Sequence, residues 1–368
     1  MSAFPGASQP DAAALRAALL GDGGEGTLAR FLAGRGPQSH ILADRSLIDA
    51  LPADPARGFT WSATLEGVPE TARAIYVDAD DELAQCRAAA TRFPGRRVWG
   101  LRHHVAPMLV GDRQPLNSVP ADFRLESLRR HVIVCPARSG STYLAQMLGQ
   151  VGAGRAREHL RDALIPAMRS PGVDRAELWR QVAWRAERDG MFATKLIGEF
   201  LIAAAGSRPV AELLAELAPD GVPVIALHRP VIDTVVSRYV AGGARLFHVR
   251  GALTPHERAH FEEGAYDATE LHALLEANLA ENRLIDEALA QLPAQRVLHV
   301  DYADLDAQPL KTVERVAAFL GVKAESNALR PAKLPIKISA RIDSSPRIRA
   351  QFIEDLRAEG RDVDALMH

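Results

Sequence analysis

Apolar residues along this chain fall into two kinds of segment, short runs and longer stretches with a helical period. The short runs lie at residues 74–77, 97–101, 132–135, 190–197, 222–227 and 297–300. Such runs suit strands, and the unbroken run at 222–227 suits a parallel strand that is buried on both faces. Helical periods separate them, at residues 80–93, 143–148, 233–239, 267–292 and 310–320. This alternation predicts an α/β fold, a three-layer sandwich around a mainly parallel sheet.

A connection that contains proline and asparagine, at residues 111–127, divides the pattern. Before it, the strand, helix and strand between residues 74 and 101 form one β-α-β unit, which predicts a small α/β domain. We place the boundary near Phe123, so the N-terminal α/β domain takes residues 1–123 and the larger domain takes residues 124–368. The role of the first domain is not indicated by its sequence.

Acidic residues follow the first of these strands, at Asp78, Asp80 and Asp81. An Asp-x-Asp pair at a strand end is the kind of metal site found in glycosyltransferases. The alternative is that the aspartates cap the next helix and complement its dipole, with Asp80 as the N-cap. We favour the helix cap. His103 and His104 are adjacent and lack the i, i+4 spacing of helical ligands, so we predict no metal site.

The run at 132–135 leads directly into a loop of small and polar residues and then into a helix. The loop carries Arg138, Ser139, Gly140, Ser141 and Thr142. Glycine lets the backbone approach a ligand, N–H groups converge at the helix start, and arginine can fork onto phosphate oxygens. The order therefore predicts a P-loop-like phosphate site, against the alternative of an ordinary strand-to-helix turn. No lysine follows Gly140, as G-x-x-x-x-G-K-[ST] would require, which weakens γ-phosphate transfer.

Residues 136–142 read Pro-Ala-Arg-Ser-Gly-Ser-Thr. They resemble the Pro-x-Arg-Ser-Gly-Ser-Thr donor loop of bacterial trehalose- and lipopolysaccharide-type carbohydrate sulfotransferases, which use 3′-phosphoadenosine-5′-phosphosulfate. The resemblance covers roughly residues 124–368. It implies that residues 138–142 hold the 5′-phosphosulfate and that Arg138 stabilises charge on the bridging oxygen as it leaves.

The same resemblance implies a general base. A Gly-x-Pro-x-Glu-aromatic run follows the first helix in the family, and here Gly154, Glu158 and His159 match it while Ala156 replaces the proline. Glu158 would accept the proton of the acceptor hydroxyl. His159 is the rival base, since animal-type cytosolic sulfotransferases are thought to use histidine. A surface glutamate paired with a nearby arginine is the structural alternative for Glu158.

A second phosphate signal follows the strand at 222–227. Arg229 lies at the strand end and Ser237 lies eight residues later, the spacing at which sulfotransferases bind the 3′-phosphate of the donor. Arg229 could instead serve in a structural ion pair. Lys195 lies within the apolar run at 190–197, where it could reach the donor or acceptor, or extend along a sheet edge. The family's tryptophan is replaced by Leu246 and Phe247, so the identity of the acceptor does not carry over.

Composition narrows the setting. A formal net charge of −2 gives no basic field for nucleic acid. The two cysteines predict no disulfide framework, and no apolar run approaches the roughly 20 residues needed to span a bilayer. The N-terminus lacks the features of a signal peptide, so we expect a cytoplasmic protein, and a homodimer is left open.

Together these signals predict a sulfotransferase. It would move a sulfuryl group from 3′-phosphoadenosine-5′-phosphosulfate, its donor substrate, to a hydroxyl of a carbohydrate or glycolipid acceptor, without a metal. Two alternatives stay open. One is a phosphotransferase (a kinase) with a degenerate P-loop, and the other is a non-catalytic nucleotide-binding protein.

Overall fold

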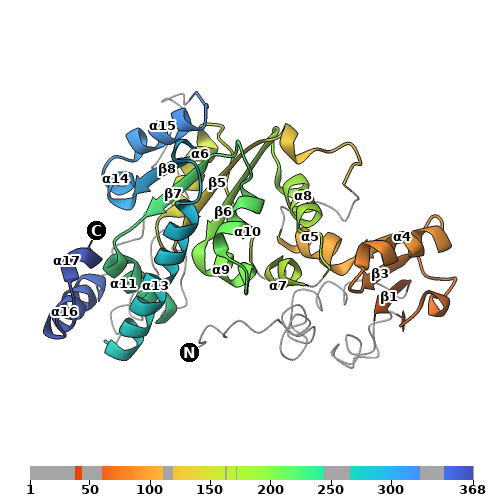
Figure 1. Ribbon diagram of the computed structural model, residues 1–368, viewed down its shortest axis with the longest axis horizontal. Helices are drawn as coiled ribbons and strands as arrows, with labels where there is room; N and C mark the ends of the chain where they lie inside the picture. Colours follow the sequence, from red (N-terminus) through yellow and green to blue (C-terminus); the bar gives the residue numbers. More distant parts are fainter. Residues whose placement is uncertain are drawn as a thin grey trace, which may run out of the picture. The chain divides into compact units, whose positions relative to one another are not determined.

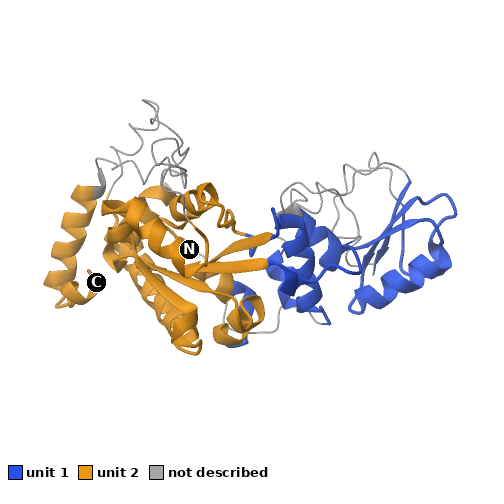
Figure 2. Ribbon diagram, turned by 90° about the horizontal axis from the view of Figure 1, so that it is seen from above, with its two compact units in different colours: residues 1–128, 159–190, 203–209 blue, residues 129–158, 191–202, 210–368 orange. Residues whose placement is uncertain are grey.

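A computed structural model describes residues 38–43, 60–110, 119–161, 164–170, 172–243, 266–323 and 344–367. The chain forms two compact units (Figure 2). Unit 1 comprises residues 1–128, 159–190 and 203–209, and unit 2 comprises residues 129–158, 191–202 and 210–368. The boundary that we place near Phe123 stays a prediction. Unit 1 also includes two later segments of the chain, residues 159–190 and 203–209.

Unit 2 is built on a four-stranded sheet with strand order β6-β5-β7-β8 (Figure 1). All its neighbours are parallel. The strands are β5 (Arg129–Cys135), β6 (Met191–Ile197), β7 (Val224–His228) and β8 (Val297–Asp301). The first strand in the chain lies between the second and the third, so the direction of strand addition reverses at β5. Ligands of such sheets bind outside the carboxyl ends of the strands at this reversal.

Helices cover both faces of this sheet. On one face, α6 (Ser141–Gln150) and α15 (Pro309–Phe319) share an apolar core with the strands, in which Ile133, Leu144 and Val316 are fully buried. Right-handed crossovers place the connections of β6 to β7 and of β7 to β8 on the other face. Those connections contain α9 (Gly198–Ala205), α10 (Val210–Leu217), α11 (Val231–Gly243) and α13 (Ala268–Leu289). The three-layer arrangement is therefore confirmed.

The other described elements of unit 2 are a 3₁₀ turn before β8 and three helices after it. The helices α16 (Ser344–Ala358) and α17 (Val363–Leu366) pack on α11 and α13 through a second apolar cluster that includes Phe352. A short helix, α14 (Tyr302–Ala307), joins β8 to α15, and the 3₁₀ turn η6 (Ala294–Arg296) precedes β8.

Unit 1 has its own four-stranded parallel sheet, in the order β2-β1-β3-β4. Its strands are β1 (Ser39–Ala43), β2 (Thr60–Ser62), β3 (Ala74–Asp78) and β4 (Arg97–Gly100). The helix α4 (Glu82–Arg92) joins β3 to β4, which confirms the predicted β-α-β unit. A π-helical turn, η4 (Leu101–Val105), leads from β4 into α5 (Ala106–Val110). The unit is completed by α7 (Leu164–Arg169), α8 (Arg175–Ala186), η3 (Leu65–Gly67) and η5 (Leu125–Ser127).

Several predicted boundaries were wrong. The strand expected at 97–101 ends at Gly100, because the chain turns into η4. The helix expected at 233–239 runs from Val231 to Gly243, so the two glycines at its end lie within the helix. Within the described part of the chain, no helix has the length and apolar character needed to cross a bilayer.

Candidate functional site

The loop between β5 and α6 has the sharp turn that the sequence predicts. Arg138 and Gly140 both have positive φ, of 68° and 87°. Gly140 is the N-cap residue of α6, and a Cβ on it would lie 2.8 Å from the Tyr302 ring. Only glycine fits this combination of backbone angle and close approach. The loop thereby carries residues 138–142 to the carboxyl edge of the sheet, at the start of a helix.

The hydroxyls of the loop have different surroundings. Ser139 is fully buried, and its hydroxyl interacts with the thiol of Cys135. Thr142 Oγ1 accepts a hydrogen bond from Lys195 Nζ at 2.8 Å. Gly140, the N-cap residue of α6, makes no side-chain capping hydrogen bond, so the backbone N–H groups at this helix start can receive an anion.

The two predicted phosphate signals meet in space. Arg138 Nε donates to Ser237 Oγ at 3.2 Å, and Arg229 Nη1 donates to the Arg138 carbonyl at 2.6 Å. The Arg229 guanidinium also lies 4.3 Å from the centre of the Tyr302 ring, a cation–π contact. Arg138, which follows β5, therefore forms one cluster with Arg229 and Ser237, which follow β7.

This cluster concentrates positive charge. Burial lowers the pKa of the Arg138 guanidinium, and the charge of Arg229 lowers it further. Burial also lowers the pKa of Arg229, whose Nε has no hydrogen-bond partner among the described residues. Two cations that are drawn together and partly desolvated are stabilised by an anion between them. The cluster therefore suits an anion.

Lys195 is the residue whose role the sequence left undecided. It lies on β6, an edge strand, yet its side chain is only 4% exposed. Its Nζ donates to Thr142 Oγ1 and to Glu158 Oε1, each at 2.8 Å. The lysine therefore points to the loop and does not extend along the sheet edge. It joins the predicted phosphate loop to the predicted base.

Glu158 reaches this position through a defined path. After α6, Gly152 and Gly154 take positive φ values of 75° and 82°, and a Cβ on Gly154 would lie 2.5 Å from Met191 Cγ. The chain then runs beside β6, where the Lys195 N–H donates to the Arg157 carbonyl at 2.7 Å. This pairing fixes the segment even though Ala156 replaces the family's proline.

The two rival bases differ in accessibility. The Glu158 side chain is 23% exposed, whereas His159 is 1% exposed. A base must come within hydrogen-bond reach of the proton that it takes. The partial exposure of the carboxylate favours Glu158, and the assignment of the base stays a prediction.

The structure also changes one argument made from the sequence. No lysine follows Gly140 in the loop, and from the sequence this absence weakens the alternative that the protein is a kinase. Lys195 supplies an ammonium group to the same loop from the neighbouring strand. The absence of a lysine from the loop sequence therefore does not distinguish sulfuryl transfer from phosphoryl transfer.

Sequence reasoning missed a buried ion triad next to the cluster. Arg238, which follows Ser237 on α11, donates to Glu281 at 2.7 Å and to Glu199 at 2.6 Å. Glu281 is 3% exposed, and burial raises its pKa while Arg238 opposes the rise. The triad ties α11 to α9 and α13, and so holds Ser237 in place. Its signal was a glutamate on the apolar face of a long helix.

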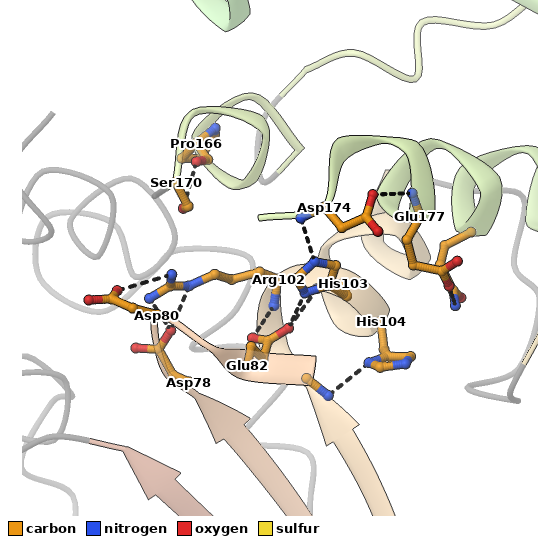
Figure 3. A network of polar contacts seen from close by, with 12 residues as sticks. Asp78, Asp80, Glu82, Arg102, His103, His104, Pro166, Ser170, Asp174 and Glu177 are labelled. Carbon is orange, nitrogen blue, oxygen red and sulfur yellow. Dashed lines mark hydrogen bonds and ion pairs between the residues drawn. The ribbon is translucent and has the colours of Figure 1, made fainter. Parts of the chain in front are cut away.

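A second polar network lies in unit 1 (Figure 3). Arg102 donates from Nε to Asp78 at 2.9 Å, and its Nη1 lies 3.5 Å from Asp80. The predicted cap at Asp80 was wrong. The N-cap residue of α4 is Asp81, and its side chain makes no capping hydrogen bond. The arginine draws Asp78 and Asp80 towards itself, which is why they leave the helix start uncapped.

Leu246 and Phe247, which replace the tryptophan of the resembling family, lie outside the described residues. Among the residues that the structure describes, no group of three or more metal-binding side chains is gathered.

Comparisons with known proteins bear on the family. The model of the sulfotransferase family matches residues 209–326, a segment that contains Arg229 and Ser237. No curated protein matches the chain. Three similar solved structures are a sulfotransferase domain from the Synechococcus PCC 7002 olefin synthase, a sulfotransferase domain from the curacin biosynthetic pathway, and a sulfotransferase from Alicyclobacillus acidocaldarius.

The first is 19% identical, with 61% of this chain and 82% of that chain covered and a TM-score of 0.34. The second is 17% identical, with 58% and 82% covered and a TM-score of 0.33. The third is 14% identical, with 66% and 99% covered and a TM-score of 0.35. The match to the sulfotransferase family model is the finding that bears on the family of this chain, and it covers residues 209–326.

Proposed function

We propose that this protein transfers a sulfuryl group from 3′-phosphoadenosine-5′-phosphosulfate to a hydroxyl group of a carbohydrate or glycolipid. One observation carries the proposal. The loop at 138–142 is joined at one end to the cationic cluster of Arg138, Ser237 and Arg229, and at the other end to the Lys195–Glu158 pair. The proposed donor-binding cluster and the candidate base Glu158 are thus both linked by hydrogen bonds to one short loop, Glu158 through Lys195.

The cationic cluster is suited to the phosphates of the donor. Arg229 and Ser237 would bind the 3′-phosphate, and residues 138–142 would hold the 5′-phosphosulfate. Arg229 Nε supports this fit, because it has no hydrogen-bond partner among the described residues and can donate to an anion. The nucleotide is a substrate here, consumed in each turnover.

The Lys195–Glu158 pair is suited to the transfer step. Glu158 would take the proton of the acceptor hydroxyl as its oxygen forms a bond to sulfur. The bond between sulfur and the bridging oxygen breaks, and 3′,5′-diphosphoadenosine leaves with the negative charge. Lys195 and Arg138 would stabilise that charge, since both are held at the loop.

The carbohydrate acceptor rests on the resemblance of residues 136–142 and 154–159 to the trehalose-type family. A glycoside, a glycolipid and a lipopolysaccharide are all members of this class. Its hydroxyl would have to approach Glu158 from the exposed side of the carboxylate.

Two measurements test the proposal. Calorimetry should show that the full chain binds 3′,5′-diphosphoadenosine and does not bind ATP with comparable affinity. A panel of glycosides and glycolipids with labelled donor should then yield a product heavier by one sulfuryl group. Preference for ATP would favour the kinase, and nucleotide binding without transfer to any acceptor would favour the non-catalytic protein.

A further inference from the structure

Unit 1 contains a cavity of about 340 Å³ at the carboxyl ends of its parallel strands. Leu42 at the end of β1, Val77 at the end of β3, and Leu65 after β2 supply apolar walls. The strand order β2-β1-β3-β4 places the reversal of strand addition at β1, beside β3. Open parallel sheets bind ligands at this point, and the volume lies within the usual range of about 300–1,000 Å³ for ligand pockets.

The polar side of the cavity is built around a buried arginine. Arg102 lines the cavity and is 2% exposed. It lies in the π-helical turn η4, and Glu82 accepts hydrogen bonds from the N–H groups of Arg102 and His103, each at 2.9 Å. A Cβ on Gly100 would clash with the Glu82 carboxylate, so glycine makes room for this support. Single π-helical turns of this kind frequently occur at functional sites.

The arginine is held on one side and loosely engaged on the other. Nε and Nη2 both contact Asp78 Oδ1 at 2.9 Å, whereas Nη1 is 3.5 Å from Asp80 Oδ1 (Figure 3). Asp78 is 5% exposed and fixes the guanidinium, but the Asp80 side chain is 82% exposed. A contact of 3.5 Å is at the limit of a hydrogen bond. A ligand can therefore take over Nη1 and the Asp80 carboxylate without breaking the Arg102–Asp78 pair.

The backbone around Asp80 is also fixed. Its carbonyl packs so closely on Gly172, which has a φ of 69°, that a Cβ there would clash. Gln85, on the first turns of α4, adds an amide to the same cavity. The cavity thus presents a donor, an acceptor and an amide from fixed elements, as a binding site requires.

Charge narrows the ligand. Asp78 and Asp80 carry two negative charges and Arg102 carries one positive charge. The three side chains together are therefore negative by one charge, and they would repel an anion. Arg102, on the other hand, already lies between the carboxylates where a metal cation would bind. A neutral molecule with hydroxyl groups suits this cavity, since each hydroxyl can donate a hydrogen bond to a carboxylate and accept one from a guanidinium.

We propose that this cavity binds a sugar ring through two neighbouring hydroxyl groups, with Asp80 accepting a hydrogen bond from one and Arg102 Nη1 donating to the other. The apolar walls of Leu42, Leu65 and Val77 face the carbon skeleton or an attached group. The ring belongs either to a free sugar or glycoside or to the ribose of a nucleoside. This inference is independent of the donor site that we propose in unit 2.

The experiment uses the full chain and ligand-observed NMR at millimolar concentrations of methyl glucoside, methyl galactoside, adenosine, 2′-deoxyadenosine and inorganic sulfate. Saturating 3′,5′-diphosphoadenosine is present, so that the nucleosides do not occupy the donor site. Asp80→Asn keeps the shape and removes the charge. Asp81→Asn is the matched control, because the neighbouring Asp81 is exposed and does not line the cavity.

We expect at least one glycoside, or adenosine, to bind and inorganic sulfate not to compete. Asp80→Asn should weaken that binding about tenfold or more, while Asp81→Asn should leave it within about twofold. If adenosine binds about tenfold more tightly than 2′-deoxyadenosine, the ligand ring is the ribose of a nucleoside. If the glycosides bind and adenosine does not, the ligand is a free sugar or glycoside. Binding of no glycoside or nucleoside, equal binding by both variants, or displacement by sulfate would overturn the proposal.

Discussion

Replacing Lys195 by methionine should impair turnover far more than folding. Methionine fills nearly the same space on β6 but removes the ammonium group that contacts Thr142 and Glu158. Loss of one partner from a fully buried ion pair costs about 3–5 kcal/mol of stability, and an exposed pair contributes about 0.2–1 kcal/mol. Because the Glu158 side chain is 23% exposed and can be rehydrated, we expect a loss of about 1–3 kcal/mol.

The expected effect on catalysis is larger. If Lys195 stabilises the leaving oxygen and orients Glu158, its removal should lower kcat by about 10²–10³-fold, the usual range for a group that stabilises developing charge. Glu158→Gln should lower kcat by about 10²–10⁴-fold. The double variant should be little worse than the poorer single variant, because groups that act as a unit are not additive.

The assay is a double-mutant cycle on Lys195 and Glu158, read by urea unfolding and by kcat with one active acceptor. Lys311→Met is the matched control, since Lys311 is exposed on α15 and should change stability by less than about 0.5 kcal/mol. Independent, multiplying effects of the two substitutions on kcat would refute the coupling. So would a Lys195 variant with the turnover of the control.

Other predictions follow from single residues. Arg229→Ala should weaken binding of 3′,5′-diphosphoadenosine by about 2–4 kcal/mol and Ser237→Ala by about 1 kcal/mol in calorimetry, with a smaller Ser237 effect on the analogue without the 3′-phosphate. His159→Ala should lower kcat by less than about tenfold, and a larger defect than that of the glutamate variant would reassign the base. Burial lowers the pKa of His131 from 6.5 to about 4, so only the unfolded chain binds its proton between these values. The free energy of unfolding should therefore decrease as the pH is lowered from 6.5 to about 4, by about 1.4 kcal/mol per pH unit, and that of His131→Phe should decrease less in urea unfolding. Gly154→Ala should lower the free energy of unfolding, measured in urea, by about 1–3 kcal/mol, because it strains a positive φ and meets a neighbouring side chain.

The sequence by itself determined the local parts of the candidate site. A buried strand, a loop with glycine and hydroxyl residues, and the helix that follows were readable because each depends on neighbours in the chain, although the helix begins at Ser141, earlier than the predicted period at 143–148. The spacing of Arg229 and Ser237 is of the same kind, since a strand end and the following helix fix it. The alternation of such segments also determined the α/β class.

Only the tertiary structure decided which of these parts meet. Arg138 and Ser237 are 99 residues apart, and Lys195 is 53 residues from Thr142 and 37 from Glu158. Their contacts depend on the strand order β6-β5-β7-β8, which brings the carboxyl ends of distant strands to one edge. Likewise, Arg102 draws Asp78 and Asp80 away from the helix cap, across 24 and 22 residues. Strand order is decided when whole elements pack against one another, so it cannot be predicted from the periodicity of a single segment.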